Sequence, residues 1–391
     1  MHGERMKENY IGEFNFLPFK KVIFGPGTVT RLKAELEELG ATRVVVITTH
    51  SLIKTALYDR IKNILGDLYV GSYEGTIQHV PRRCVLEGAR MCRQLKADSL
   101  VAFGGGSCID TAKGIALVIA EGEELDRLRV RFVPPNKLEV PTLKKQKIPI
   151  VTISTTLSGA EFTNIIGITD EARRSKDLYI DNGVTPKVIF LDPEMTTATP
   201  PILWASTGMK TFSDAIEMVC SPNHQPFTAT LCLEAIKIFY HDLPRSVKEP
   251  LNLNVREKLQ FAMRMTFSGF TNVLVGAVAA LRHQIGALFN IPHGIASTIV
   301  LPHVIEFNLS VIMARLSLIA NAMGITTYTV KKAIQNLIKE LGLPQRLREV
   351  SVKESDLELI AKYALEDFII LGNPKPITNI DQLLQILRNA F

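Results

Sequence analysis

The first half of the chain alternates short β-branched runs with stretches of helical periodicity, and this alternation most restricts its fold. Such a pattern is typical of a parallel sheet joined by crossover helices. The later runs are almost continuously apolar, as expected for strands that are buried on both faces. The expected strands are Arg43–Thr49, Ser99–Phe103, Ile148–Thr155 and Lys187–Asp192, and the expected helices are Ser51–Leu65, Pro81–Leu95 and Ser107–Ala120.

The pattern changes after Asp192 and Pro193. Strand-like runs become rare, and helical periodicity dominates from Gly208 to Phe391. A length of 391 residues also suggests two domains. We therefore expect an α/β domain over residues 1–193 and an all-helical domain over residues 194–391. The uncharged run Met265–Leu281 is interpreted as a buried helix, and the charged insert Glu121–Lys147 as a surface loop.

Charge and cysteine content restrict the partners. The net charge is +6, and no Lys/Arg block is dense enough for a nucleic-acid arm, so an anionic small molecule is the simpler explanation. Five cysteines without a C-x-x-C pair suit a reducing cytosol. The N-terminus lacks the apolar region of a signal peptide, and the uncharged run Met265–Leu281 falls short of the roughly 20 apolar residues of a membrane span. We expect a cytoplasmic protein with a small-molecule ligand and no nucleic-acid or membrane partner.

Three glycines follow the expected strand Ser99–Phe103 and precede the helix expected to open at Ser107. A backbone without Cβ atoms lets a pyrophosphate approach closely, and the free N–H groups of a helix start attract anions. Asp110, three residues after Ser107, predicts a capping box. The motif is not G-x-G-x-x-G, so a purely structural glycine turn is the alternative.

A second polar turn, Thr155–Glu161, leaves the next buried strand at the edge where open α/β sheets bind ligands. The alternative is a Ser/Thr-rich loop that hydrogen-bonds its own backbone. The candidate phosphate-binding residues of the two turns are Gly104, Gly105, Gly106, Ser107, Asp110, Thr155, Thr156 and Ser158.

Motifs along nearly the whole chain resemble the iron-containing alcohol dehydrogenase family, of the dehydroquinate-synthase-like superfamily. The resemblance implies a Rossmann-like dinucleotide-binding domain, an all-α C-terminal domain, NAD or NADP as cofactor, and a homodimer. Other stretches lean toward the maleylacetate reductase branch. The family motifs are GGGSCIDTAK, TTLSGAE, FGPGTV and IPHGIASTIVLPHVIEFN, and the branch motifs are FNFLPFKKVIFGPGTV, Gln78–Pro81 and FTNIIGIT.

The resemblance also implies a divalent metal in the C-terminal domain, and here the chain departs from the family. The family's ligands are an Asp and a His spaced i, i+4, followed by two later histidines. Lys210 stands at the Asp position, Asp214 at the His position and Ala279 at the third position, so only His293 remains. These donors are too few for Zn²⁺ or Fe²⁺. We expect a metal-free pocket, the alternative being a weak ion held by Asp214, His283 and His293.

Lys210 is expected to supply the positive charge that the metal brings in the family. Its ammonium would hydrogen-bond a substrate oxygen, while Asp214 one turn later holds it in place. The alternative is an exposed Lys–Asp pair contributing a few tenths of a kcal/mol. His283 and His293 lie in a segment that lines the active site of the family, so either is a candidate proton donor.

The choice between NAD and NADP depends on a second position at which the chain differs from the family. In the family, an Asp at the end of the strand expected at Arg43–Thr49 contacts the adenosine ribose and would repel a 2′-phosphate. This chain has Thr49 there, which predicts dual or NADP-leaning use. His79 and Lys176 are carried over as further cofactor contacts, although Lys176 is equally consistent with a surface charge.

Three functions remain open. The favoured one is metal-independent hydride transfer between NAD(P) and an alcohol/carbonyl pair. The second is reduction of an unsaturated oxo-dicarboxylic acid, in which Lys210 and Arg282 would bind the carboxylates. The third is a catalytically degenerate member kept for cofactor binding, which the intact glycine turn and the two histidines disfavour.

Overall fold

In the computed structural model, which describes residues 10–133, 137–173 and 175–391, the chain forms two compact units. The α/β unit comprises Leu17–Pro200 and Pro250–Gln260, and the helical unit comprises the described part of residues 1–16 with Pro201–Glu249 and Phe261–Phe391. Neither unit is continuous in sequence. The segment Pro250–Gln260 belongs to the α/β unit because the buried Arg256 donates to the carbonyl and hydroxyl oxygens of Thr196, at 3.1 and 3.0 Å.

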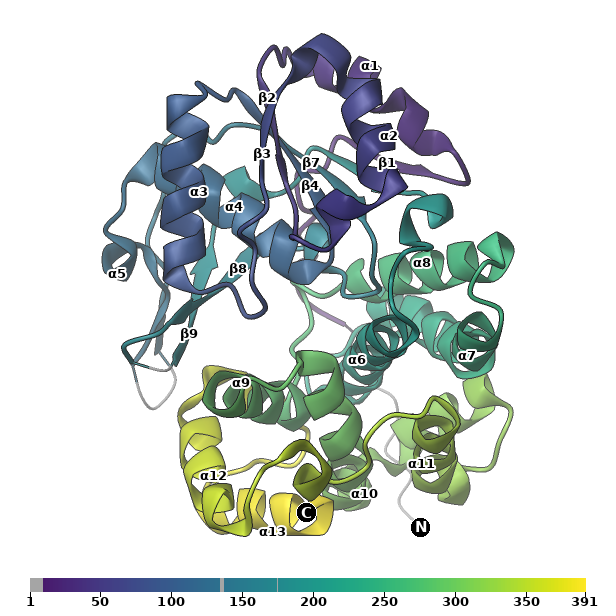
Figure 1. Ribbon diagram of the computed structural model, residues 1–391. Coiled ribbons are helices and arrows are strands. Elements are labelled where there is room, and N and C mark those ends of the chain that lie inside the picture. Colours follow the sequence, from purple (N-terminus) through teal and green to yellow (C-terminus); the bar gives the residue numbers. More distant parts are fainter. Residues whose placement is uncertain (1–9, 134–136, 174) are drawn as a thin grey trace. The chain divides into compact units, whose positions relative to one another are not determined.

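A six-stranded parallel sheet forms the centre of the α/β unit (Figure 1), in the order β1-β10-β7-β4-β2-β3. Chain order reverses beside β2, because β3 pairs with one of its edges and β4 with the other. Ligands of such sheets bind at the carboxyl ends of the strands at this reversal. The strands are β1 (Lys21–Phe24), β2 (Val44–Ile47), β3 (Tyr69–Tyr73), β4 (Ser99–Gly104), β7 (Ile150–Ser154) and β10 (Val188–Leu191).

Helices cover both faces of this sheet (Figure 1). Val45 and Ile47 of β2 pack toward α3 (Arg82–Gln94) and α4 (Gly106–Glu121). Val44 and Val46 face the opposite core, formed with α1 (Leu32–Glu38) and α2 (Ala56–Leu65). Because successive strand residues point to opposite faces, both sets must be apolar, which explains the continuous apolar runs.

Two antiparallel hairpins complete this unit: β5 (Arg131–Val133) with β6 (Lys137–Glu139), and β8 (Ile165–Asp170) with β9 (Ser175–Ile180). The prediction of a loop over Glu121–Lys147 is wrong in its described residues. The segment contains α5 (Leu125–Leu128) and the β5–β6 hairpin, and ion pairs from Asp126 of α5 to arginines hold this helix in place.

The second unit is all helical, as the sequence predicts from Gly208 onward. Its central helix is α10, which packs against α6, α7, α9, α11 and α13. By length and composition α10 could cross a membrane, but 72% of its apolar window is buried inside the protein, as in a core helix. The helices are α6 (Pro201–Cys220), α7 (Pro226–Lys248), α9 (Ala277–Phe289), α10 (His293–Met323), α11 (Val330–Glu340), α12 (Leu357–Glu366) and α13 (Ile380–Ala390). The last part of α8 (Leu253–Phe267) also belongs to this unit, whereas its residues up to Gln260 belong to the α/β unit.

One predicted helix is interrupted. The run Met265–Leu281 is not one buried helix, because α8 ends at Phe267 and α9 starts at Ala277. Two glycines lie in the break, and neither has room for a side chain. A Cβ on Gly269 would collide with the side chain of Thr228, and one on Gly276 would lie 2.9 Å from the Cα of Asn373. The two glycines allow the connecting segment to pack closely against Thr228 and Asn373, and glycine is itself unfavourable inside a helix.

Candidate functional site

The two polar turns of the α/β unit lie side by side, as expected. The Thr155 N–H donates to the Gly104 carbonyl oxygen at 3.0 Å. A Cβ on Gly105 would lie 2.8 Å from Cγ2 of Thr156, and one on Gly106 would lie 3.0 Å from the hydroxyl of Ser158. The glycines are therefore required by the packing of one turn on the other. Gly104 also has a φ of 152°, which disfavours any other residue.

The start of α4 presents backbone donors at this edge. Cys108 and Ile109 donate to the Gly105 carbonyl, at 3.0 and 3.2 Å. The first N–H groups of a helix have no partner inside it, and within the described residues no hydrogen bond occupies those of Gly106 and Ser107. Both residues are half-buried at the carboxyl end of β4. This arrangement provides an anion cradle.

The predicted capping box is wrong. The N-cap of α4 is Gly105, with no side-chain cap. Asp110 instead accepts a hydrogen bond from the Gly167 N–H of β8 at 3.2 Å. It therefore ties the helix to the neighbouring hairpin, and its negative charge favours the charged form of Lys176.

His79 and Lys176, predicted as cofactor contacts, come together beside Asp110. The Lys176 ammonium donates to the His79 carbonyl oxygen at 2.7 Å. Burial lowers the pKa of Lys176 to about 8, although Asp110 favours its charged form, so Lys176 is not an ordinary surface charge. His79 and Val80 both have positive φ, at 64° and 53°, a strained pair of the kind that collects at functional sites.

Thr49 follows the carboxyl end of β2, where the family has its Asp. Its backbone pairs with Gly75, and its hydroxyl lies 3.0 Å from the Ser51 hydroxyl. A carboxylate does lie nearby, because Glu74 pairs with Nδ1 of His50 at 3.0 Å. No local pattern in the sequence marks Glu74 for this place, and His50 offsets its negative charge when that imidazole is protonated.

A charged cluster lies in the helical unit at the positions where the resemblance predicts the family's metal ligands. Asp214 on α6 is fully buried, and its two oxygens lie 2.8 Å from the Lys210 ammonium and 2.5 Å from the Arg282 guanidinium. Burial favours a raised pKa for Asp214, but Arg282 and Lys210 outweigh it and hold the pKa below its ordinary value. The Lys210–Asp214 pair is not the exposed surface pair of the alternative interpretation, because the Lys210 side chain is only 16% exposed.

Two aromatic rings fix the Lys210 ammonium further. It lies 4.6 Å from the ring centre of Phe267 and 5.8 Å from that of Phe270. Cations are attracted to ring faces, with about 0.5–2 kcal/mol per contact. The ammonium is therefore held between a carboxylate and two rings.

Arg282, a candidate for binding a substrate carboxylate in the second function, contacts Asp214 instead of an open surface. Its side chain is buried, and Nη1 donates to Asp214 and lies 3.5 Å from the Ser297 hydroxyl. A guanidinium engaged in this way supports the buried carboxylate of Asp214.

Glu217 lies one turn after Asp214 and accepts the backbone N–H groups of Val278 and Ala279, at 2.9 and 3.2 Å. It thereby caps the start of α9, the helix that carries Arg282 and His283. Burial raises the pKa of Glu217 to about 7, although Arg282 favours its charged form.

These residues do not fit a divalent ion. Both Asp214 oxygens already face cations, whose charge repels a metal, and the buried Ala279 offers no ligand atom. Within the described residues, the ligand atoms of Asp214, His283 and His293 do not form a group with mutual distances under 4.8 Å. The donor set supports neither the family's site nor a weak site made from its remnants.

The two candidate histidines are neighbours. The ring centres of His283 and His293 lie 5.6 Å apart, and the planes are tilted by 66°. Nδ1 of His283 lies 2.9 Å from Oδ2 of Asp367, and both side chains are mostly buried. Asp367 is fixed in turn by the Ile369 N–H, which donates to its other oxygen at 3.1 Å. A carboxylate on Nδ1 orients the ring and leaves Nε2 for proton exchange.

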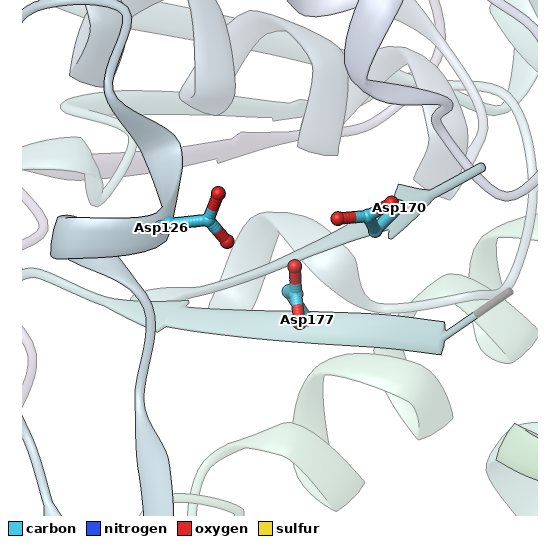
Figure 2. A group of neighbouring side chains, drawn as sticks. All are labelled: Asp126, Asp170 and Asp177. Carbon is cyan, nitrogen blue, oxygen red and sulfur yellow. The ribbon is translucent and has the colours of Figure 1, made fainter. Parts of the chain in front are cut away.

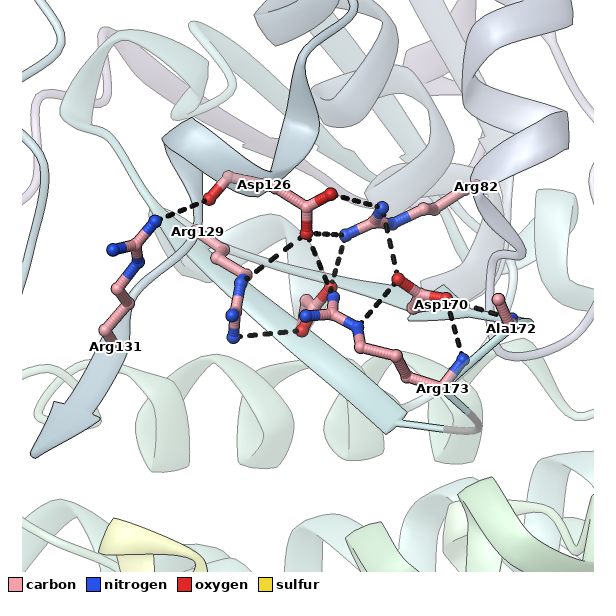
Figure 3. Close-up of polar contacts among 8 residues, drawn as sticks. Arg82, Asp126, Arg129, Arg131, Asp170, Ala172 and Arg173 are labelled. Carbon is pink, nitrogen blue, oxygen red and sulfur yellow. Dashed lines mark hydrogen bonds and ion pairs between the residues drawn. The ribbon is translucent and has the colours of Figure 1, made fainter.

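Three aspartates elsewhere are close enough to share an ion. Asp126 of α5, Asp170 of β8 and Asp177 of β9 point toward one another (Figure 2). Arg82 contacts all three at 2.8–3.1 Å, and Arg173 contacts them at 2.5–3.2 Å (Figure 3). Because guanidinium groups already balance these charges, the cluster is an ion-pair network that ties α5 to the β8–β9 hairpin.

Three residues of the site were not found by sequence reasoning: Asp367, and the rings Phe267 and Phe270. Asp367 follows His283 by 84 positions, so no local spacing links them. The rings lie at the end of α8 and in the loop after it, where a continuous helix was expected.

Comparison with known proteins agrees with this architecture. Residues 19–193 match the family described as iron-containing alcohol dehydrogenase, and residues 204–391 match the C-terminal part of the Fe-containing alcohol dehydrogenase family. The NAD-dependent methanol dehydrogenase of Bacillus methanolicus is 33% identical over 388 residues, covering 96% of this chain and 99% of that protein.

Two solved structures share the fold. A 1,3-propanediol oxidoreductase has a TM-score of 0.90 at 28% identity, covering 97% of this chain and all of its own. A maleylacetate reductase from Agrobacterium tumefaciens has a TM-score of 0.80 at 22% identity, with 98% and 99% covered, and shows the fold alone. On its matched motifs, its fold and its full-length relative, the chain belongs to the iron-containing alcohol dehydrogenase family.

Proposed function

We propose that this protein transfers hydride between NAD(P)H and an aldehyde or ketone, and back from the alcohol, with Lys210 in place of the family's metal. The observation that carries the proposal is the buried Lys210–Asp214–Arg282 cluster at the metal-ligand positions. Two cations and one carboxylate give the cluster a formal charge of +1, which favours a substrate oxygen that gains negative charge during reduction.

The cofactor proposal rests on the α/β unit. The glycine turn, the adjoining Thr/Ser turn and the N–H groups at the start of α4 would hold the pyrophosphate. When bound, the nicotinamide supplies or accepts the hydride. An NAD-dependent methanol dehydrogenase at 33% identity supports NAD. Thr49 supports tolerance of NADP, because no carboxylate stands at that position, while Glu74 nearby opposes it.

Lys210 would donate a hydrogen bond to the carbonyl oxygen of the substrate. Asp214 and the two rings fix the ammonium before the substrate arrives, so little reorganisation is needed during the reaction. Arg282 balances the charge of the buried carboxylate, which keeps Asp214 ionised while Lys210 donates to the substrate.

The alkoxide formed by hydride transfer must gain a proton. We propose that His283 provides it through Nε2, since Asp367 holds Nδ1. His293 is the alternative donor, because its ring lies beside that of His283. If a His283→Gln variant keeps full activity, His293 is the proton donor in place of His283.

The alternative functions are less well supported. Reduction of an oxo-dicarboxylic acid needs contacts for two carboxylates, and Arg282 is occupied by Asp214. A degenerate, non-catalytic member would not need the oriented His283–Asp367 pair.

The test is a kinetic one on the full-length protein, with metal content measured by mass spectrometry. We expect oxidation of NADH or NADPH with an aldehyde panel, unchanged by a chelator, and no stoichiometric Zn or Fe. Loss of activity with chelator and its return with Fe²⁺ or Zn²⁺ would refute the metal-free reaction. Activity restricted to unsaturated oxo-dicarboxylic acids would favour the second function, and cofactor binding without turnover the third.

A further inference from the structure

A separate pocket lies on the helical unit, among residues to which the proposed reaction assigns no role. Its volume is about 910 Å³, and it is lined by α10, α11, α13 and two connecting loops. Small-molecule sites in proteins have volumes of roughly 300–1,000 Å³. The pocket is therefore large enough for an organic ligand and much larger than a single inorganic ion requires.

The lining is electropositive. Lys331, Arg346 and Lys375 contribute three positive charges, and Glu306, which pairs with Lys331 at 2.7 Å, is the acidic residue among the lining residues. In the described part of the chain, the Arg346 guanidinium donates to the Asn389 carbonyl at 3.2 Å and retains further N–H donors. Arginine and lysine together are the usual partners of phosphate and carboxylate groups.

An apolar wall adjoins these charges. Phe307 lines the pocket, and the Lys375 ammonium lies 4.3 Å from its ring centre. A ligand with a carbon skeleton would contact this wall while its anionic groups meet the cations.

His303 supplies an independent observation. It lines the pocket and is only 8% exposed, and within the described residues its Nδ1 is buried without a hydrogen-bond partner. Burial, together with the positive charges of Lys331 and Arg346, lowers the pKa of His303 to about 4, although Glu306 favours its charged form. A buried polar atom without a partner is rare in folded proteins, and here it belongs to a residue that lines the electropositive pocket.

We propose that this pocket, formed by His303, Lys331, Arg346 and Lys375, binds a small organic molecule carrying two or more phosphate or carboxylate groups. The net charge of the lining cations and Glu306 is +2, which matches a ligand with at least two negative charges. The proposal does not depend on the proposed hydride transfer, because the two sites share no residue.

The test measures binding of pyrophosphate and of citrate to the full-length protein by isothermal titration calorimetry at constant ionic strength, with excess NADH present so that the proposed cofactor cradle is occupied. We expect saturable binding of at least one of them. The double variant Lys331→Ala/Arg346→Ala should weaken it at least about 100-fold, because it removes two charged hydrogen-bond donors from the pocket. A preference for pyrophosphate assigns the phosphate class, and a preference for citrate the carboxylate class.

The matched control is Lys332→Ala/Lys339→Ala, which removes two exposed lysines from the same helix, α11, without touching the pocket. It should leave binding nearly unchanged, because exposed charges farther away are screened. Equal weakening by both double variants, or no saturable binding of either probe, would overturn the proposal.

Nuclear magnetic resonance of the histidine rings gives a second measurement that does not need the variants. A bound anion offsets the field of Lys331 and Arg346, so the pKa of His303 should rise on binding. Binding detected by calorimetry with no change at His303 would place the ligand elsewhere and refute this site.

Discussion

Replacing Lys210 by methionine is the sharpest test of the proposed reaction, because it removes one charge and little volume. Methionine keeps the apolar contact with Phe267 and Phe270. Asp214 keeps its contact with Arg282 at 2.5 Å, so the buried carboxylate still has a cation beside it. The variant is therefore expected to fold.

Two magnitudes follow from the contacts. Loss of one charged hydrogen bond should lower the free energy of unfolding by about 1.5–3 kcal/mol. If Lys210 stabilises the developing alkoxide, kcat should fall about 10²–10³-fold, the cost of removing one preorganised donor. The KM for the cofactor should change little, because its proposed cradle belongs to the α/β unit.

The pH dependence has a definite sign. The pKa of Asp214 lies below its ordinary value, so the ion pairs stabilise the fold above the unfolded pKa and are lost as pH falls through the folded pKa. Removing Lys210 raises the folded pKa, so acid unfolding of the variant should begin at a higher pH than in the wild type.

The assay is the change in NADH absorbance under steady-state conditions, with thermal unfolding followed by circular dichroism. The control is Lys237→Met on α7, which removes a lysine that is 55% exposed and pairs with Glu234. It should leave both kcat and stability nearly unchanged. A Lys210→Met protein with wild-type kcat would refute the role given to the ammonium.

Three further predictions follow from the other contacts. Asp367→Asn should keep the cap on the Ile369 N–H but disturb the orientation of His283, lowering kcat about 10- to 100-fold and shifting the pH–rate profile; an unchanged profile would exclude Asp367 as a positioning residue. The free energy of unfolding of the wild type should fall as the pH rises from about 4.5 to 7, because Glu217 keeps a proton in the folded state that the unfolded state releases. Glu217→Gln should abolish this fall, so the free energies of unfolding of the two proteins, measured with urea, should diverge by up to roughly 3 kcal/mol across this range. Curves of stability against pH that stay parallel for the two proteins would contradict this prediction. Gly105→Ala brings a Cβ within 2.8 Å of Thr156, so fluorescence titration should show NADH affinity weakened about 10-fold or more, and undiminished affinity would exclude the glycine turn as the cradle.

The buried strands and their glycine turn are readable from the sequence because their causes are local. A strand covered on both faces must be apolar at every position, and Gly104 requires a φ that other residues avoid. The i, i+4 spacing of Lys210 and Asp214 likewise follows from one helix, α6. The departure from the family's metal ligands is therefore visible in the residue types alone.

Two of the predictions that were wrong, a capping box and a continuous helix, concern features that depend on contacts between segments distant in the sequence. The capping box at Asp110 fails because β8 offers the Gly167 N–H to this carboxylate. The helix expected over Met265–Leu281 breaks because Thr228 and Asn373 leave no room for side chains at its glycines.

The parallel sheet of the first half, and the residue types at the positions where the resemblance predicts metal ligands, can be read from the sequence. The full burial of Asp214 between Lys210 and Arg282, and the contact of Asp367 with His283 across 84 positions, appear only in the folded chain. The physical reason is that spacing specifies neighbours within one helix or strand, whereas the strength of a charge depends on burial and on partners that packing brings from elsewhere in the chain.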